Sequence, residues 1–192
     1  TGLWIWTRKH PRNPEVTIIL MDTEGLDSPH IPNWYNWTLS AVALLIATYF
    51  VYQTKGHIDA HSIERLSVIL QVAEQLKGDK ADTSTDLPNF LWLIRDHQLK
   101  MTAAPKEEMM AKLTDKQKEA LDRCFAASDC FPLPRPVDKE SDLQNVEQMP
   151  YNELKEDFKE EYLVLERQIF TAVANPRKLN GRIITGETLA KL

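Results

Sequence analysis

Two nearly continuous apolar runs, each followed at once by charged residues, constrain the fold of this chain most strongly. Val16 to Met21 precedes Asp22, and Asn89 to Ile94 precedes Arg95 and Asp96. Short runs that are apolar almost throughout are typical of strands covered on both faces in an α/β sheet. Ligands of such sheets bind beyond the carboxyl ends of the strands, so these two strand ends are the places to search for chemistry.

The rest of the chain alternates between strand and helix patterns. Strands are expected at residues 3–7, 16–21, 49–52, 89–94 and 130–134, with the first two forming a hairpin and the last lying at an edge. Helices are expected at residues 36–47, after an N-cap at Asp59, from Pro105 through Phe125, and at residues 153–173, and residues 179–186 resemble a hairpin leading into a final helix. This order predicts an α/β domain with a mostly parallel sheet flanked by helices.

Composition excludes several classes of protein. The 192 residues suffice for one domain, and the net charge of −5 argues against a nucleic-acid-binding surface. Cys124 and Cys130 are expected to be buried, reduced thiols of a cytosolic protein. The most apolar stretch, residues 37–52, is shorter than the ~20 residues that cross a bilayer. We therefore interpret it as a buried helix that leads into a buried strand.

The first strand end, Asp22-Thr23-Glu24-Gly25, suits a metal and a phosphate. An aspartate there could hold a water of Mg²⁺, a cation that keeps several waters and takes few direct carboxylates. Gly25 would let its backbone N–H approach a terminal phosphate without a Cβ in the way. The turn-rich residues 26–33 suit a loop that changes shape on hydrolysis. Taken alone, the pattern is better explained by a structural turn.

The second strand end, Arg95-Asp96, suits a purine base. A carboxylate can accept two N–H bonds from the Watson–Crick edge of guanine, which adenine cannot supply. Burying that carboxylate without its partner costs free energy, so the choice of base follows from the unpaired group. Taken alone, Arg-Asp is as well explained by a surface ion pair.

The two motifs are more specific together, because both follow apolar strands in the order that a nucleotide-binding sheet needs. No G-x-x-x-x-G-K-[ST] occurs in the sequence, so no residue here could cradle a β-phosphate as a P-loop does. The first residue is Thr1 rather than Met. If the chain is part of a GTPase, it is an N-terminally truncated domain of the P-loop NTPase type.

Over nearly its whole length the chain resembles the guanylate-binding proteins and atlastins, large GTPases of the dynamin superfamily. Gly2-Leu3-Trp4-Ile5-Trp6 resembles that family's Gly-Ile-Trp-Met-Trp strand, and residues 20–26 are similar to its Leu-Leu-Asp-Thr-Glu-Gly-Leu. Leu93-Ile94-Arg95-Asp96 matches the Arg-Asp motif used there in place of Asn-Lys-x-Asp.

Further positions resemble the same family. Cys130-Phe131 with Arg135-Pro136-Val137 is similar to the strand that leads into the guanine cap, and residues 180–186 resemble the end of the GTPase domain. Trp4 and Glu24 favour the guanylate-binding proteins, whereas Leu133-Pro134 favours the atlastins.

The resemblance implies a Mg²⁺-dependent GTPase with a role for each matching position. Asp22 would hold Mg²⁺ through water, with Thr1 as a further ligand. Gly25 would contact the γ-phosphate, and Glu24, the catalytic candidate, would order the network of the attacking water. The P-loop and the arginine that completes catalysis would lie upstream of Thr1.

The guanine end and the partners are implied in the same way. Arg95 and Asp96 would face the base, and residues 135–150 would form the guanine cap and part of a face through which two copies pair. The implied partners are GTP, GDP and a second copy, with no nucleic acid, and with membrane contact only through parts outside this chain. The resemblance implies a cytoplasmic protein of the immune response.

Three functions remain open from the residues. The parent protein is a working GTPase, or a GTP-dependent dimerisation module with little or no hydrolysis, or a structural scaffold without a nucleotide. The isolated 192 residues are expected to bind GTP weakly or not at all and to be inactive.

Overall fold

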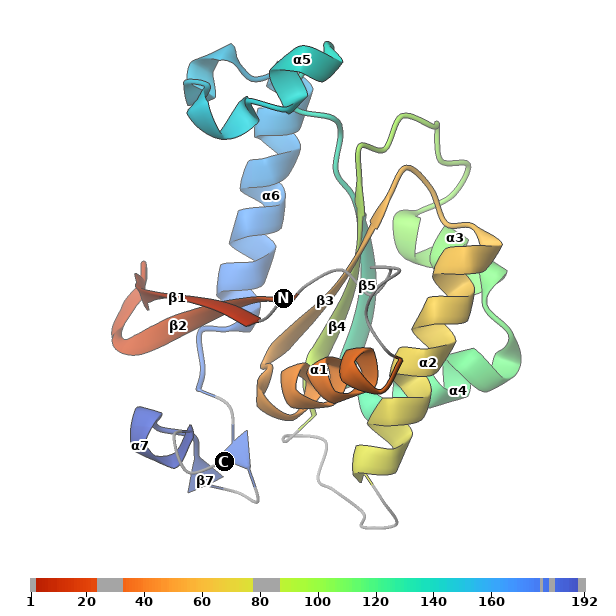
Figure 1. The fold of residues 1–192 in the computed structure, drawn as a ribbon, viewed down its shortest axis with the longest axis vertical. Helices are drawn as coiled ribbons and strands as arrows, with labels where there is room; N and C mark the ends of the chain where they lie inside the picture. Colours follow the sequence, from red (N-terminus) through yellow and green to blue (C-terminus); the bar gives the residue numbers. More distant parts are fainter. Residues whose placement is uncertain (1–2, 24–32, 78–86, 177, 180–181, 190–192) are drawn as a thin grey trace.

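The centre of the molecule is a three-stranded parallel sheet. The computed structural model describes residues 3–23, 33–77, 87–176, 178–179 and 182–189. The sheet contains β3 (Tyr49–Lys55), β4 (Asn89–Arg95) and β5 (Ala127–Pro132), in that spatial order. Helices flank both of its faces (Figure 1), which confirms the predicted α/β class.

The central strand β4 is buried on both faces, as its apolar run predicts. Phe90, Trp92 and Ile94 belong to a core shared with α2 (Ala60–Lys77), α3 (Pro105–Lys112) and α4 (Asp115–Cys124). Leu91 and Leu93 point the other way, into a second core that includes Leu165 of α6 (Glu156–Ala172). The indole N–H of Trp92 donates to Thr54 Oγ1 at 2.8 Å, so its one polar atom is satisfied.

Helix α2 begins where the sequence predicts. The Ser62 N–H donates to Asp59 Oδ1 at 2.7 Å, which makes Asp59 the N-cap. In return the Asp59 N–H donates to Ser62 Oγ at 2.9 Å. Helix α1 (Asn33–Ile46) packs beside α2, but its apolar stretch is only partly buried: Leu44 and Ala47 are covered, while Trp37 and Leu45 are exposed.

The single helix expected from Pro105 through Phe125 is wrong. The structure has two helices, α3 and α4, because the backbone is extended at Leu113 and a new helix starts after Thr114. Thr114 Oγ1 accepts from the Gln117 N–H, and Gln117 Oε1 accepts from the Thr114 N–H, which together form a capping box. The two backbone groups that a continuous helix would have used are satisfied by these side chains.

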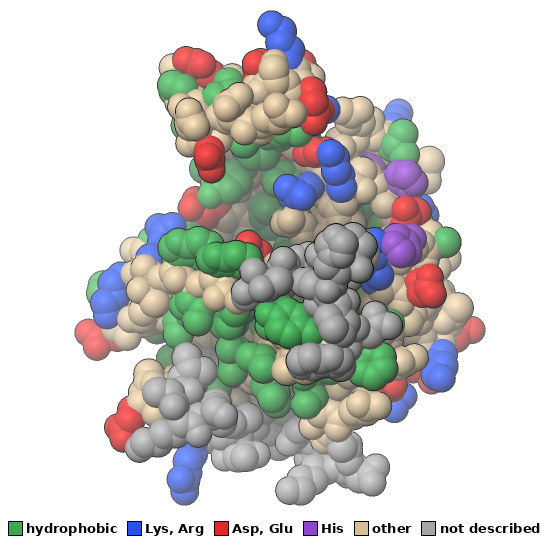
Figure 2. All heavy atoms as spheres, in the orientation of Figure 1, with side chains coloured by type: hydrophobic (Ala, Val, Ile, Leu, Met, Phe, Trp, Pro, Cys, Tyr) green, Lys and Arg blue, Asp and Glu red, His purple; other side chains and the backbone are tan. Residues whose placement is uncertain are grey.

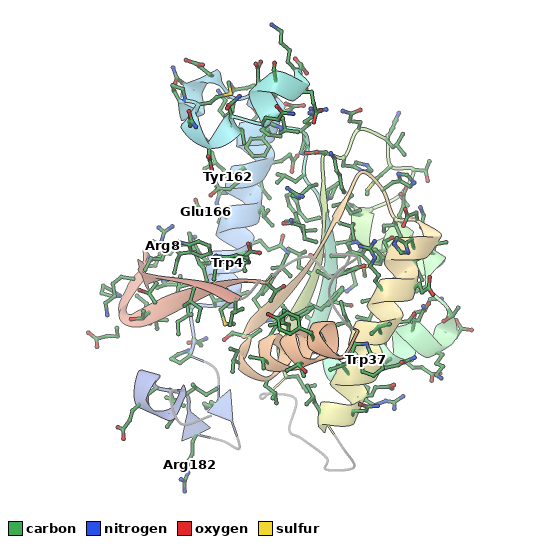
Figure 3. All side chains as sticks on the ribbon, in the orientation of Figure 1. Trp4, Arg8, Trp37, Tyr162, Glu166 and Arg182 are labelled. Atoms are coloured by element: carbon green, nitrogen blue, oxygen red, sulfur yellow. The ribbon has the colours of Figure 1, made fainter. Side chains whose placement is uncertain are left out.

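The expected hairpin is present, in a sheet of its own. β1 (Leu3–His10) pairs antiparallel with β2 (Asn13–Thr23). His10 Nε2 bonds Phe170 O of α6 at 2.7 Å, and the Arg8 guanidinium lies 4.9 Å from the centre of the Phe170 ring. Trp4 and Arg8 project to the side of the hairpin where Tyr162 and Glu166 of α6 lie (Figure 3).

The prediction that residues 16–21 are covered on both faces is wrong. Val16 and Ile18 are buried, but Leu20 is 45% exposed, and on β1 Trp4 and Trp6 are exposed as well. Hydrophobic side chains gather over the hairpin at the molecular surface (Figure 2). The physical reason is that the hydrogen-bond and ring contacts of the hairpin go to α6 and the residues just after it, which lie on one side.

The remaining elements lie after the sheet. β5 spans residues 127–132 rather than the expected 130–134 and is an edge strand as predicted. The short helices that follow are α5 (Glu140–Leu143), η2 (Val146–Gln148) and η3 (Tyr151–Glu153). The C-terminal hairpin and helix are also present, as β6 (Lys178–Leu179), β7 (Arg182–Ile183) and α7 (Gly186–Leu189).

Candidate functional site

The carboxyl ends of the three parallel strands meet at one edge of the sheet, where cross-strand bonds fix them. The Gly56 N–H, just after β3, donates to Arg95 O at 2.7 Å. The Leu133 N–H, just after β5, donates to Ile94 O at 2.8 Å. We call this edge, formed by residues 55–56, 94–97 and 132–135, the strand-end rim. Ligands bind at such edges in α/β proteins, so the rim is the candidate site.

Asp96 occupies the middle of the rim in an uncommon backbone conformation. Its φ of 55° lies in the left-handed region, and it is the one non-glycine residue with positive φ among the described residues. Aspartate tolerates this conformation better than most residues. Its side chain is only 14% exposed, and Lys55 Nζ lies 3.6 Å from its Oδ2. The rim therefore holds a nearly buried carboxylate whose counter-charge, Lys55, is exposed to solvent.

A cavity of about 460 Å³ opens next to the strand-end rim, and the residues that directly follow Asp96 in the chain line it, although Asp96 itself does not. Its walls come from the loop after β4, the segment after β5 and the start of α6, and its lining residues are His97, Gln98, Leu99, Lys100, Pro134, Arg135, Asp138, Lys155 and Asp157. This volume lies within the range of about 300–1,000 Å³ typical of small-molecule sites. Three of the lining residues come from the segment expected to be the guanine cap or stand next to it.

Ion pairs organise the expected cap segment, residues 135–150. Arg135 Nη2 lies 2.6 Å from Glu140 Oε2, and the charge and hydrogen bond of Arg135 lower the pKa of Glu140, with a smaller contribution from Lys55. Lys155 Nζ lies 3.1 Å from Asp138 Oδ1, and its backbone N–H donates to Pro136 O at 2.9 Å. These contacts hold the segment against the start of α6 and beside the rim.

The other predicted site residues are not all gathered at the rim. Arg95 ends β4 with an exposed side chain. Asp22 lies near the end of β2, opposite Trp4 and exposed to solvent, so it belongs to the hairpin sheet and not to the sheet of Asp96. Thr1, Glu24 and Gly25 lie outside the described residues, as does the turn-rich stretch at residues 26–33 apart from Asn33, which begins α1.

Comparison with known proteins places the chain in a family. Residues 1–179 match the sequence model described as "Guanylate-binding protein, N-terminal domain". The chain belongs to the guanylate-binding protein family. Guanylate-binding protein 6 of Pongo abelii is 27% identical over 223 residues, covering 100% of this chain and 35% of that protein. Human guanylate-binding protein 2 is 29% identical over 220 residues, covering 100% of this chain and 37% of that protein.

The chain therefore spans little more than a third of the length of these guanylate-binding proteins. The matched range, 1–179, contains the strand-end rim, the cavity and the cap segment. Among the described residues, no helix combines the length and the apolar character needed to span a membrane.

The Mg²⁺ that a guanylate-binding protein implies has one described candidate ligand. In the described part of the chain, no three His, Cys, Asp or Glu side chains come together as a metal cage. Asp22 is a single exposed carboxylate at a strand end. Such a residue fits Mg²⁺, which keeps several waters and binds through one or two carboxylates together with substrate phosphates.

Lys55 and His97 are rim residues of this guanylate-binding protein that the sequence patterns did not single out. Lys55 ends β3 and pairs with Asp96, while His97 lines the cavity and contacts the end of β3. The available signal was their position directly next to turns that end apolar strands. A lysine or histidine at such a place has many structural explanations, so the pattern alone did not distinguish them.

Proposed function

We propose that this chain is the guanine-reading and switch portion of a large GTPase domain that binds GTP and hydrolyses it with Mg²⁺. On this proposal residues 1–192 run from the end of the first switch to the end of the domain. The observation that carries the proposal is Asp96, a nearly buried carboxylate at the end of a two-face-buried strand, in a rim whose next residues line an open cavity. Membership in the guanylate-binding protein family supports it.

Asp96 suits guanine for electrostatic reasons. Its carboxylate would accept from the ring N–H and the exocyclic amino group of the base, and adenine offers no such pair of donors. The present partner, Lys55, is 64% exposed and 3.6 Å away, so this contact contributes little and exchanges readily. Guanine would then donate two hydrogen bonds to the shielded Asp96 carboxylate. A base that lacks these two N–H groups would leave the carboxylate without them. Arg95, beside it, would face the base from the same strand end.

The phosphate end of the nucleotide would lie at the end of β2. Asp22 would hold Mg²⁺ through water, with Thr1 as a further ligand, and the metal would neutralise charge on the phosphoryl oxygens. Gly25 would bring a backbone N–H to the γ-phosphate, and Glu24 would orient the attacking water. These roles rest on the motif that residues 20–26 share with the family. On this proposal the phosphate-cradling loop comes from outside the 192 residues, since their sequence contains no G-x-x-x-x-G-K-[ST].

The cap segment suggests how the domain would pair. Residues 135–150 carry charges of both signs, most of them exposed, and Arg135 and Asp138 of this segment line the cavity at the strand-end rim. We propose that this segment covers the base and contributes to a face through which two copies associate and promote hydrolysis. The alternative is a module that uses GTP to associate but hydrolyses it poorly.

The test of base recognition is Asp96→Asn in the full-length protein. Asparagine tolerates the left-handed conformation, so the backbone is retained. The carboxamide loses one acceptor for guanine but could donate to the C2 carbonyl of xanthine. We expect the ratio of GTP to ATP affinity to fall by at least about tenfold and binding of xanthosine triphosphate to improve. Nucleotide titration calorimetry measures all three affinities.

Asp122→Asn is the matched control, because Asp122 is an exposed aspartate of α4 that does not line the cavity. It should leave all three affinities unchanged. An Asp96→Asn protein with the GTP:ATP ratio of the wild type would overturn the base-reading role. A protein that binds GTP as predicted but turns it over no faster than buffer would favour the interaction module.

A further inference from the structure

The side chain of His97 ties the end of β3 to the loop after β4. Its Nδ1 lies 2.8 Å from Gly56 O, and the two residues are 41 positions apart in the sequence. A carbonyl oxygen only accepts, so Nδ1 carries the hydrogen and donates. The bond bridges two strand ends through a ring rather than through the backbone ladder.

The backbone of His97 makes the matching tie on the other side. Its N–H donates to Leu133 O at 3.1 Å, just beyond β5. The Gly56 N–H donates to Arg95 O, and the Leu133 N–H donates to Ile94 O. With these bonds, the residues directly before and after Asp96 are each fixed to a neighbouring strand. Asp96 lies between these fixed points.

That position explains how Asp96 keeps its uncommon φ of 55°. Left-handed backbone is unfavourable for a residue with a Cβ and persists where the surroundings hold it. If the ring bond to Gly56 is removed, the backbone bonds at Arg95 O and the His97 N–H remain, but the loop after β4 loses its side-chain tie to the end of β3. The carboxylate would then sample positions away from the one that suits a base.

We propose that His97 is a positioning residue for guanine recognition: its ring bond to Gly56 fixes the Asp96 carboxylate at the rim. The proposal rests on the proposed function, since it names a residue that acts through Asp96. His97 also lines the cavity of about 460 Å³ and a smaller one of about 90 Å³. Within the described residues its Nε2 is buried without a hydrogen-bond partner, so Nδ1 carries the bond that matters.

The experiment compares four variants of the full-length protein. His97→Leu removes the donor. His97→Asn places an amide N–H close to the position of Nδ1, whereas His97→Gln places it close to the position of Nε2. His57→Leu is the matched control, because His57 is an exposed histidine beside Gly56 that does not line the cavity of about 460 Å³. Affinities for GTP and ATP, kcat and KM, and thermal midpoints are measured for each.

We expect His97→Leu and His97→Gln to weaken GTP affinity by about three- to tenfold, the size of one lost hydrogen bond. Their affinity for ATP should be unchanged, so the GTP:ATP ratio falls equally. KM for GTP should rise, while kcat should stay within about twofold of the wild-type value. The reason is that base binding contributes equally to the ground state and the transition state. His97→Asn should recover most of the ratio, and His57→Leu should match the wild type.

Two outcomes would overturn the proposal. If His97→Asn and His97→Gln give the same GTP:ATP ratio, the position of the donor does not matter, and this comparison stands even where His97→Leu fails to fold. A GTP:ATP ratio unchanged in all His97 variants would also contradict it. Asp96→Asn distinguishes the positioning role of His97 from the base-reading role of Asp96. If Asp96→Asn shifts base preference while the His97 variants do not, only the role of His97 is contradicted. If Asp96→Asn does not shift base preference, the base-reading role is contradicted as well.

Discussion

At the scale of single residues, burial decides which side chains are chemically available. Asp96 keeps its carboxylate at the surface edge of the core with 14% of its side chain exposed. Cys130, only a few residues from the rim along β5, lies fully within the core opposite Trp92. Burial, followed by the charges of Asp129 and Glu108, raises the pKa of the Cys130 thiol to about 12. The thiolate is the reactive form, so burial and the raised pKa both reduce the reactivity of this cysteine.

We predict that Cys130 does not react with thiol reagents in the folded protein. A pKa of about 12 against an ordinary value near 9 lowers the thiolate fraction near neutral pH by about 10³-fold. Cys124 is also buried and its pKa is raised for the same reason, so neither thiol should titrate with Ellman's reagent until denaturant is added. Rapid native labelling of Cys130 would show that β5 opens readily.

At the scale of elements, local hydrogen bonds decide where helices start. The backbone hydrogen bond from Ser62 lowers the pKa of Asp59, the N-cap of α2. A lowered folded pKa means that the stabilisation is present above the unfolded pKa of about 4 and is lost as the pH falls through the folded value.

We therefore predict that Asp59→Ala lowers the free energy of unfolding by about 1 kcal/mol at neutral pH. The difference from the wild type should shrink below about pH 4. Urea unfolding at the two pH values measures it. Asp59→Ser, whose hydroxyl also caps a helix, should lose much less stability. Equal losses for alanine and serine would show that the cap contributes nothing.

Elements with a local signal were predictable from sequence, and elements that depend on distant contacts were not. The apolar run of β4 and the N-cap of α2 are confirmed because a strand's composition and a cap's side chain act locally. The division between α3 and α4 was missed because helical spacing continues across Thr114, although the capping box of Thr114 starts a new helix there. The exposure of β2 was missed because an apolar run does not say which elements cover it.

The candidate site shows the same division. The place of Asp96 at a strand end followed from the order of the strands, since parallel strands end at one edge. The contacts of Lys55 and His97 join residues 41 positions apart and depend on the register between β3 and β4. No local pattern encodes that register, so the sequence alone could not reveal them.

At the scale of the whole molecule, the two proposed ends of the nucleotide lie on separate sheets. Asp22 lies on the hairpin sheet, and Asp96 lies on the parallel sheet. Apolar side chains of the hairpin remain exposed, including Trp4 and Trp6. On the proposed function, a single GTP reaches from the parallel sheet to the hairpin sheet, and the longer protein supplies the phosphate-cradling loop.

The most direct measurement of that requirement is a crystal structure of the full-length protein with Mg²⁺ and a non-hydrolysable GTP analogue. We predict that the guanine donates from its ring N–H and amino group to the Asp96 carboxylate, while Asp22 contacts a water of the Mg²⁺ beside the terminal phosphates. A base bound away from Asp96, or an Asp22 too far from the phosphates to reach the metal through a water, would contradict the account.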